Sequence, residues 1–62
     1  MENAKAIKEL RYRLGMTQEQ LAVALGVTVS AVHRWESGKA QPSPLAIKAM
    51  ETIDNKASAN QN

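Results

Sequence analysis

The chain has 62 residues and no cysteine, so one small domain must fold on packed apolar side chains, without disulfides or thiolate metal sites. Its single histidine has no carboxylate at the spacing of a metal site, and no stretch fits a membrane span or a signal peptide. We therefore expect no metal, no cofactor, no membrane partner and a cytoplasmic location. The net charge of +2 permits a polyanionic partner without requiring one.

A first helix is predicted over residues 4–14. Ile7, Leu10 and Leu14 recur at helical spacing, Asn3 can cap the start, and Gly15 can supply the left-handed residue that ends a helix. Basic residues crowd this segment, which fits either a solvated helix face or a contact with nucleic acid; they are Lys5, Lys8, Arg11 and Arg13.

Two short helices follow, predicted over residues 18–25 and 29–37. Thr17 and Gln20 have the spacing of a capping box at the start of the first, and Gly26 ends it. Thr28 can cap the second, and Gly38 ends it. So short a link sets two helices at a steep angle, as in a helix-turn-helix.

A fourth helix is predicted over residues 44–53, after a loop. Ser43 can cap it, and Pro44 fits the first helical position because its missing N–H would be unpaired there. Its apolar stripe comprises Ala46, Ile47, Met50 and Ile53. Residues 55–62 are polar and are expected to form a disordered tail, which leaves residues 1–54 as the domain. The fold class is all-α, with four helices.

The segment from Ile7 to Ile53 resembles the Cro/C1-type (XRE-type) repressor domains of phages and bacteria. The residues that carry this resemblance are Leu10-Arg11, Gly15 to Ala22, Leu25 to Thr28, Val32, Trp35 to Lys39 and Pro42-Ser43. The resemblance implies a lambda-repressor-like fold and a sequence-specific regulator, most often a repressor, that binds double-stranded DNA at the nucleoid. Many members have a fifth helix that supplies the dimer contact. The sequence has no bulky apolar residue after Ile53, so we expect that helix to be missing here.

The predicted third helix is the expected reading helix. At about 100° per residue, Thr28, Val32 and Trp35 fall on its inner side, whereas Ser30, His33, Arg34 and Ser37 point away and Val29 lies at the edge. In a helix-turn-helix the second helix lies in the major groove, with its N-terminal residues at base edges. The candidates for base contact are Thr28, Val29, Ser30, His33 and Arg34. Arg34 is suited to guanine and Val29 to a thymine methyl group, although Val29 could instead be partly buried.

Contacts to DNA phosphates are expected on both sides of the reading helix. Gln18 lies in the first turn of the second helix, where free N–H groups and the helix dipole favour a phosphate, and the family resemblance gives it that role. The other candidates are Ser37, Lys39, Gln41 and Ser43, although a solvated loop would show the same residues. The resemblance also implies that Arg11 pairs with Glu36 as a structural clasp between helices, rather than contacting DNA.

Other functions remain as alternatives. The sequence shows neither a nucleophile, histidine and carboxylate pattern nor a phosphate-binding loop, so we expect no catalytic residues and no enzyme. An antitoxin-like module that binds a protein and regulates its own operon would have the same helices, and RNA could bind the same basic face. A weak dimer through the fourth helix, a dimer formed only on DNA, and a fragment of a longer protein are all compatible with the sequence.

Overall fold

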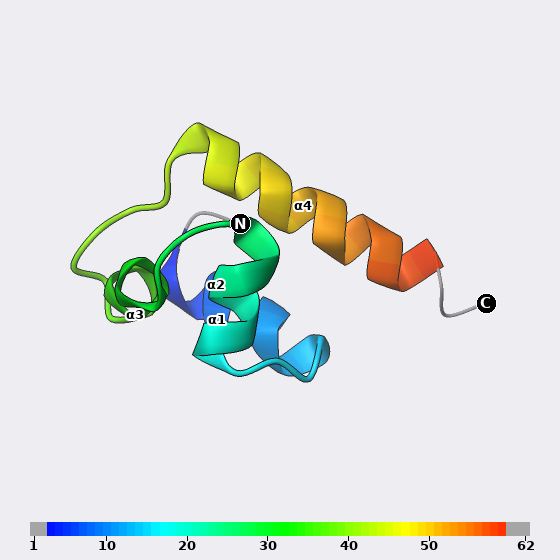
Figure 1. Ribbon diagram of the computed structural model, residues 1–62, viewed down its shortest axis with the longest axis horizontal. Coiled ribbons are helices and arrows are strands. Elements are labelled where there is room, and N and C mark those ends of the chain that lie inside the picture. Colours follow the sequence, from blue (N-terminus) through cyan, green and yellow to red (C-terminus); the bar gives the residue numbers. More distant parts are fainter. Residues whose placement is uncertain (1–2, 60–62) are drawn as a thin grey trace.

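The computed structural model describes residues 3–59, which form four α-helices without a strand. The helices are α1 (Ala4–Arg13), α2 (Gln18–Leu25), α3 (Val29–Glu36) and α4 (Pro44–Ala59). Helix α3 packs against both α1 and α2, and α4 lies against α2 with its C-terminal half extending past the other three helices (Figure 1). The all-α fold class is confirmed. None of the described helices has the length and apolar character that crossing a membrane requires.

Helix starts follow the capping residues that the sequence predicts. The Asn3 side chain accepts a hydrogen bond from the N–H of Ala6, and Thr17 and Gln20 form a complete capping box. Thr28 accepts from the N–H of Ala31, and Ser43 accepts from the N–H of Ala46. Each cap satisfies an N–H group that has no partner within its own helix, so the four starts are fixed locally.

The turn between α2 and α3 depends on Gly26. Gly26 has φ +72° and ψ +33°, in the left-handed region, and its N–H closes the end of α2 by bonding to Ala22 and Val23 carbonyl oxygens. A Cβ built on Gly26 would meet no atom within 4 Å. The requirement for glycine is therefore conformational, because left-handed backbone costs other residues energy, and it does not reflect lack of space.

The core lies where the four helices meet. Its buried residues, two from each helix, are Ile7, Leu10, Leu21, Ala22, Val32, Trp35, Ala46 and Met50. Helices α2 and α3 make the most extensive contact of any pair. Ala22 is 3% exposed within this core, so a larger side chain at this position would have to displace its neighbours. Ile47 and Ile53, predicted to complete the buried stripe of α4, are only half-buried.

The predicted end of the fourth helix at residue 53 is wrong, because α4 continues through Ala59. Residues 55–59, expected to be part of a disordered tail, are helical; the rest of that tail, 60–62, lies outside the described residues. Neither glycine nor proline interrupts this stretch, and Lys56 lies in the last turn, where a positive charge favours the helix dipole. Arg13 Nη2 also bonds to Asp54 Oδ2 at 3.0 Å, which links α4 to the end of α1.

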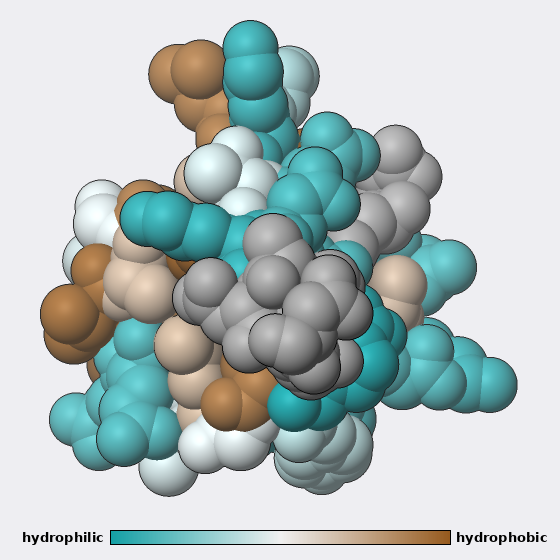
Figure 2. All heavy atoms as spheres, turned by 90° about the vertical axis from the view of Figure 1, so that its right-hand side faces the viewer, coloured by the Kyte–Doolittle hydropathy of each residue, from teal (hydrophilic) through white to brown (hydrophobic). Residues whose placement is uncertain are grey.

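Two other predicted boundaries shift by one residue, since Leu14 and Ser37 are the C-caps of α1 and α3 rather than their last residues. Hydrophilic side chains cover much of the face shown in Figure 2, with hydrophobic spots between them. The large apolar side chains exposed among the described residues are Tyr12, Val23, Val29 and Leu45.

Candidate nucleic-acid interface

The outer face of α3 and the start of α2 together form a shallow hollow. Its volume is about 410 Å³, and the residues that line it are Gln18, Val29, Ser30, His33 and Arg34. All but Gln18 lie on α3, and those four are exposed. Val32 and Trp35, on the opposite side of α3, are in the core. The structure therefore brings four of the five predicted base-reading residues together with the predicted phosphate contact Gln18.

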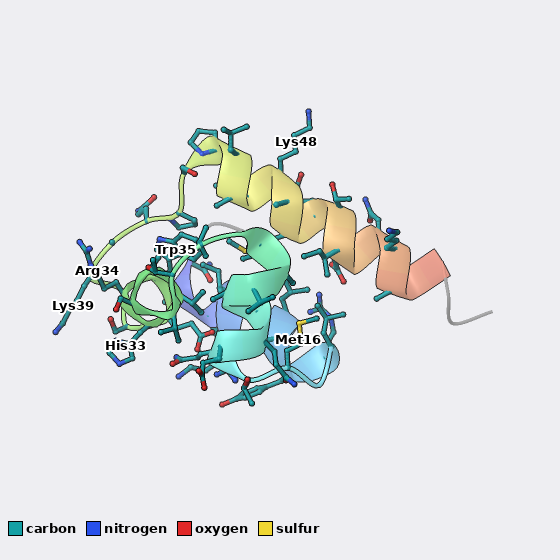
Figure 3. All side chains as sticks on the ribbon, viewed as in Figure 1. Met16, His33, Arg34, Trp35, Lys39 and Lys48 are labelled. Atoms are coloured by element: carbon teal, nitrogen blue, oxygen red, sulfur yellow. The ribbon has the colours of Figure 1, made fainter. Side chains whose placement is uncertain are left out.

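Long side chains project from this face into solvent. In Figure 3, His33, Arg34 and Lys39 point outward from α3 and the loop that follows it, whereas the labelled Trp35 lies toward the inside. The loop is held against the end of α3, because the N–H of Lys39 bonds to the Arg34 carbonyl oxygen at 2.9 Å and the N–H of Ala40 bonds to the same oxygen at 3.3 Å. Lys39 thus lies beside the end of α3 on a backbone that two hydrogen bonds hold in place.

The remaining predicted contact residues lie around the hollow rather than in it. Thr28 is exposed, so its expected position on the inner side of the helix is wrong; its hydroxyl caps α3 from outside the core. Ser37 is exposed, and its hydroxyl donates to the Arg34 carbonyl oxygen at 3.1 Å. Gln41 is exposed in the loop, and the Ser43 hydroxyl caps α4. Thr28, Ser37 and Ser43 therefore each have a local structural role.

The expected clasp between Arg11 and Glu36 is present and buried. Arg11 Nε donates to Glu36 Oε2 at 2.8 Å, and Arg11 Nη2 donates to Glu36 Oε1 at 2.9 Å. The Glu36 side chain is 2% exposed and that of Arg11 is 12% exposed. This two-bond geometry matches the planar guanidinium to the carboxylate and joins α1 to the end of α3.

The clasp shifts the acid–base equilibria of both groups. The hydrogen bond to Glu36 raises the pKa of Arg11 above its usual value. Burial of the Glu36 carboxylate raises its pKa, but hydrogen bonds from Arg11 and Gln18 and the charges of Arg11 and Lys8 lower it, and the net pKa lies below the usual value. Glu36 is therefore held as a carboxylate, and its charge is compensated by Arg11.

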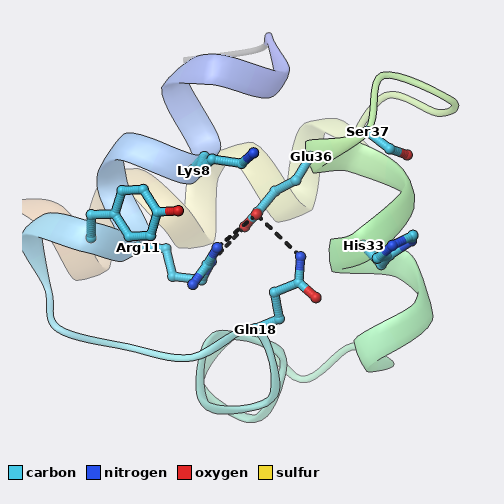
Figure 4. A pocket seen from close by; sticks show the side chains of 7 residues that line it. Lys8, Arg11, Gln18, His33, Glu36 and Ser37 are labelled. Carbon is cyan, nitrogen blue, oxygen red and sulfur yellow. Dashed lines mark hydrogen bonds and ion pairs between the residues drawn. The ribbon is translucent and has the colours of Figure 1, made fainter.

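A second, smaller cleft of about 190 Å³ lies between α1 and α3 and adjoins the hollow through shared residues Gln18 and His33. Figure 4 shows Arg11, Glu36 and Gln18 joined across it by hydrogen bonds. Lys8 and Tyr12 also line this cleft, and the sequence did not single them out as site residues. The spacing of Lys8 and Arg11, three residues apart on one helix, places them on the same face and could have indicated Lys8.

Comparison with known proteins identifies the family to which the chain belongs. The family described as Helix-turn-helix matches residues 7–56. The chain belongs to this family, of the Cro/C1-type (XRE-type), whose members are DNA-binding domains of transcription regulators.

Individual relatives differ in the proteins that carry the domain. HTH-type transcriptional activator BcrR of Enterococcus faecalis is 36% identical over an alignment that covers 98% of this chain and 32% of the relative. Antitoxin MqsA of Escherichia coli (strain K12) is 38% identical over 77% of this chain and 37% of the relative. Type II methyltransferase M1.ScrFI of Lactococcus lactis subsp. cremoris is 47% identical over 71% of this chain and 12% of that enzyme. The chain thus matches at most about a third of the length of these relatives.

Proposed function

We propose that this domain binds a short operator in double-stranded DNA, with α3 in the major groove, and represses transcription from it. The observation that carries the proposal is the hollow in which Val29, Ser30, His33 and Arg34 of α3 line up beside Gln18 at the start of α2. A helix-turn-helix presents its second helix to base edges and the start of its first helix to the DNA backbone. The base contacts proposed for α3 and the phosphate contact proposed for Gln18 therefore lie side by side on one surface.

Base reading is assigned to the exposed side chains near the start and middle of α3. Arg34 can donate two hydrogen bonds to O6 and N7 of a guanine, and the Val29 side chain, 42% exposed, can contact a thymine methyl group. Ser30 and His33 can each bond to several bases, and Thr28 lies at the N-terminal end of α3. A ring N–H of His33 can also donate to a phosphate oxygen.

Phosphate contacts are assigned to the residues that flank the reading helix. Gln18 lies at the start of α2, where unpaired N–H groups and the helix dipole favour an anion. Lys39 supplies the positive charge on the opposite side, and the exposed polar groups of Ser37, Gln41 and Ser43 lie along the same loop. These contacts give affinity for any duplex, whereas the α3 side chains give preference among sequences.

Repression requires only this surface, because a protein bound across a promoter excludes the polymerase without a further contact. The match to the methyltransferase covers only 12% of that enzyme and gives no argument for methyl transfer by this domain. We also propose that dimerisation is weak or occurs on DNA. Leu45 is 81% exposed on α4, and Ile47 and Ile53 are half-buried, so this helix retains apolar surface for a second copy. Binding to chromosomal DNA would place the protein at the nucleoid.

A second candidate function is an antitoxin-like module that binds a protein and regulates its own operon. The similarity to antitoxin MqsA favours it, although that match covers only 37% of the relative. This function uses the same DNA surface and adds a protein partner, so the two candidates differ in whether the domain also binds a second protein.

The test is selection of bound duplexes from a random pool by the purified protein, followed by sequencing. The proposal predicts an enriched motif, and two inverted half-sites if copies bind as a dimer. A reporter placed behind the selected site then separates repression from activation. A failure to bind any duplex at low salt and high protein concentration would overturn the proposal, and of the second candidate it would leave only the binding of a protein partner. Binding to structured RNA in preference to duplex DNA would also overturn the proposal.

A further inference from the structure

We infer that Glu36 is a positioning residue for DNA binding, which acts by holding Gln18 in place beside the reading helix. The inference rests on the proposed function and on one contact between helices. Gln18 Nε2 donates to Glu36 Oε1 at 3.2 Å, and the Gln18 side chain is half-buried. One end of the clasp is therefore bonded to the side chain proposed to contact a phosphate.

The same ion pair also fixes the backbone that precedes Gln18. Arg11 Nη1 donates to the Met16 carbonyl oxygen at 3.2 Å, directly before the Thr17 cap of α2. Arg11 thus holds the entry to α2 and, through Glu36, the first side chain of that helix. Both contacts fix the position of the start of α2 relative to α3. They therefore also fix the distance between Gln18 and the exposed face of α3.

The hydrogen-bonding capacity of each group fits this role. Glu36 accepts two bonds from Arg11 and one from Gln18, so both of its carboxylate oxygens are bonded within the protein. The Gln18 amide uses one N–H for Glu36 and has a second N–H, which can donate to a phosphate oxygen. Figure 4 shows Gln18 below the clasp, with Glu36 between it and Lys8. Holding the amide before DNA arrives removes part of the ordering cost of the contact.

A role for Glu36 through its charge and a role in positioning Gln18 predict opposite effects of Glu36→Gln on DNA affinity. If Glu36 acted only through its charge, removing a negative charge near DNA would strengthen binding. If Glu36 positions Gln18, the variant weakens that hold, because its amide has one acceptor oxygen where Glu36 uses two and turns an NH2 group toward a donor of Arg11 or Gln18. Binding to all duplexes then weakens by about two- to tenfold, the range for one neutral hydrogen bond. The salt dependence of binding stays the same, because no phosphate-neutralising charge is lost.

The experiment measures duplex affinity for the wild type, Glu36→Gln, Gln18→Ala and the double variant, at a temperature where circular dichroism shows each to be folded. We expect both single variants to bind more weakly and the double variant to bind no more weakly than Gln18→Ala. Unchanged or tighter binding by Glu36→Gln, or losses that multiply in the double variant, would overturn the inference. Loss of duplex binding by the wild type itself would instead overturn the proposed function.

A measurement on the wild type covers the case in which Glu36→Gln does not fold. The NMR order parameter of the Gln18 side-chain amide is compared with that of Gln41, which is exposed in the loop. The inference predicts a restrained Gln18 amide in the protein without DNA and a mobile Gln41 amide. Equal mobility of the two amides would contradict it.

Discussion

At the scale of single residues, we expect substitutions that break the ion pair between Arg11 and Glu36 to destabilise the fold strongly. The Glu36 side chain is buried and that of Arg11 is only 12% exposed, so removal of Arg11 leaves an unpaired carboxylate in the interior. Breaking such a pair typically costs about 3–5 kcal/mol. We expect Arg11→Ala to lower the melting temperature sharply, as measured by circular dichroism.

Arg13→Ala is the matched control for that variant. Arg13 is on the same helix and pairs with Asp54 at 3.0 Å, but the side chains are 54% and 28% exposed. Exposed pairs contribute about 0–1 kcal/mol, so the control should melt close to the wild type. If Arg11→Ala melts like Arg13→Ala and binds DNA more weakly, Arg11 is a phosphate contact rather than a clasp.

The same pair makes stability depend on pH in the acid range. The pKa of Glu36 is lowered in the folded protein from a reference of 4.5, so the folded state releases this proton at lower pH than the unfolded state. The resulting stabilisation is complete above the unfolded pKa and is lost as pH falls through the folded pKa. Melting curves between pH 7 and 3 should show the wild type losing its advantage over Glu36→Gln as pH falls. A constant difference between them would show that the Glu36 charge does not stabilise the fold.

At the scale of the elements, the angle between α2 and α3 determines which side chains face the DNA. Ala22 lies in the core where these helices meet, whereas Ala24, on the same helix, is exposed. Ala22→Leu should cost about 1–3 kcal/mol, because extra methylene groups must force the helices apart. Ala24→Leu should leave the free energy of unfolding nearly unchanged. Urea denaturation of the two variants measures both values, and equal stability would show that α3 does not pack closely on Ala22.

The sequence predicts the elements well where the signals are local. Caps at Asn3, Thr17, Thr28 and Ser43 each act within three residues of themselves, so the helix starts could be identified from spacing alone. The end of α4 could not, because nothing in residues 54–59 stops a helix, while their polarity suggested a tail. Low apolar content and helix formation are compatible when one side of a helix faces solvent.

Contacts between helices were harder to predict. The face of α3 followed from helical periodicity, and the pairing of Arg11 with Glu36 followed from the family resemblance. The bond from Gln18 to Glu36 and the cleft lined by Lys8 and Tyr12 were missed, because both depend on how α1 and α2 cross α3. Spacing along one helix does not contain that information.

At the scale of the whole molecule, this small domain uses one set of side chains for its core and leaves another set exposed for recognition. The core takes two residues from each helix, and the outer side of α3 with its flanking residues stays exposed as the surface proposed to bind DNA. With a net charge of only +2, general attraction to DNA is modest. The proposed function therefore assigns preference for one sequence to side chains at base edges rather than to overall charge.

The most direct test of this account compares Arg34→Ala with Lys39→Ala on the selected duplex and on a scrambled duplex, over a range of salt concentrations. Arg34→Ala should lose about 1–3 kcal/mol on the selected duplex and much less on the scrambled one. Lys39→Ala should weaken both about equally and reduce the salt dependence by roughly one phosphate contact. Equal losses for Arg34→Ala on the two duplexes would contradict the account, because Arg34 would then hold the DNA backbone without reading its sequence.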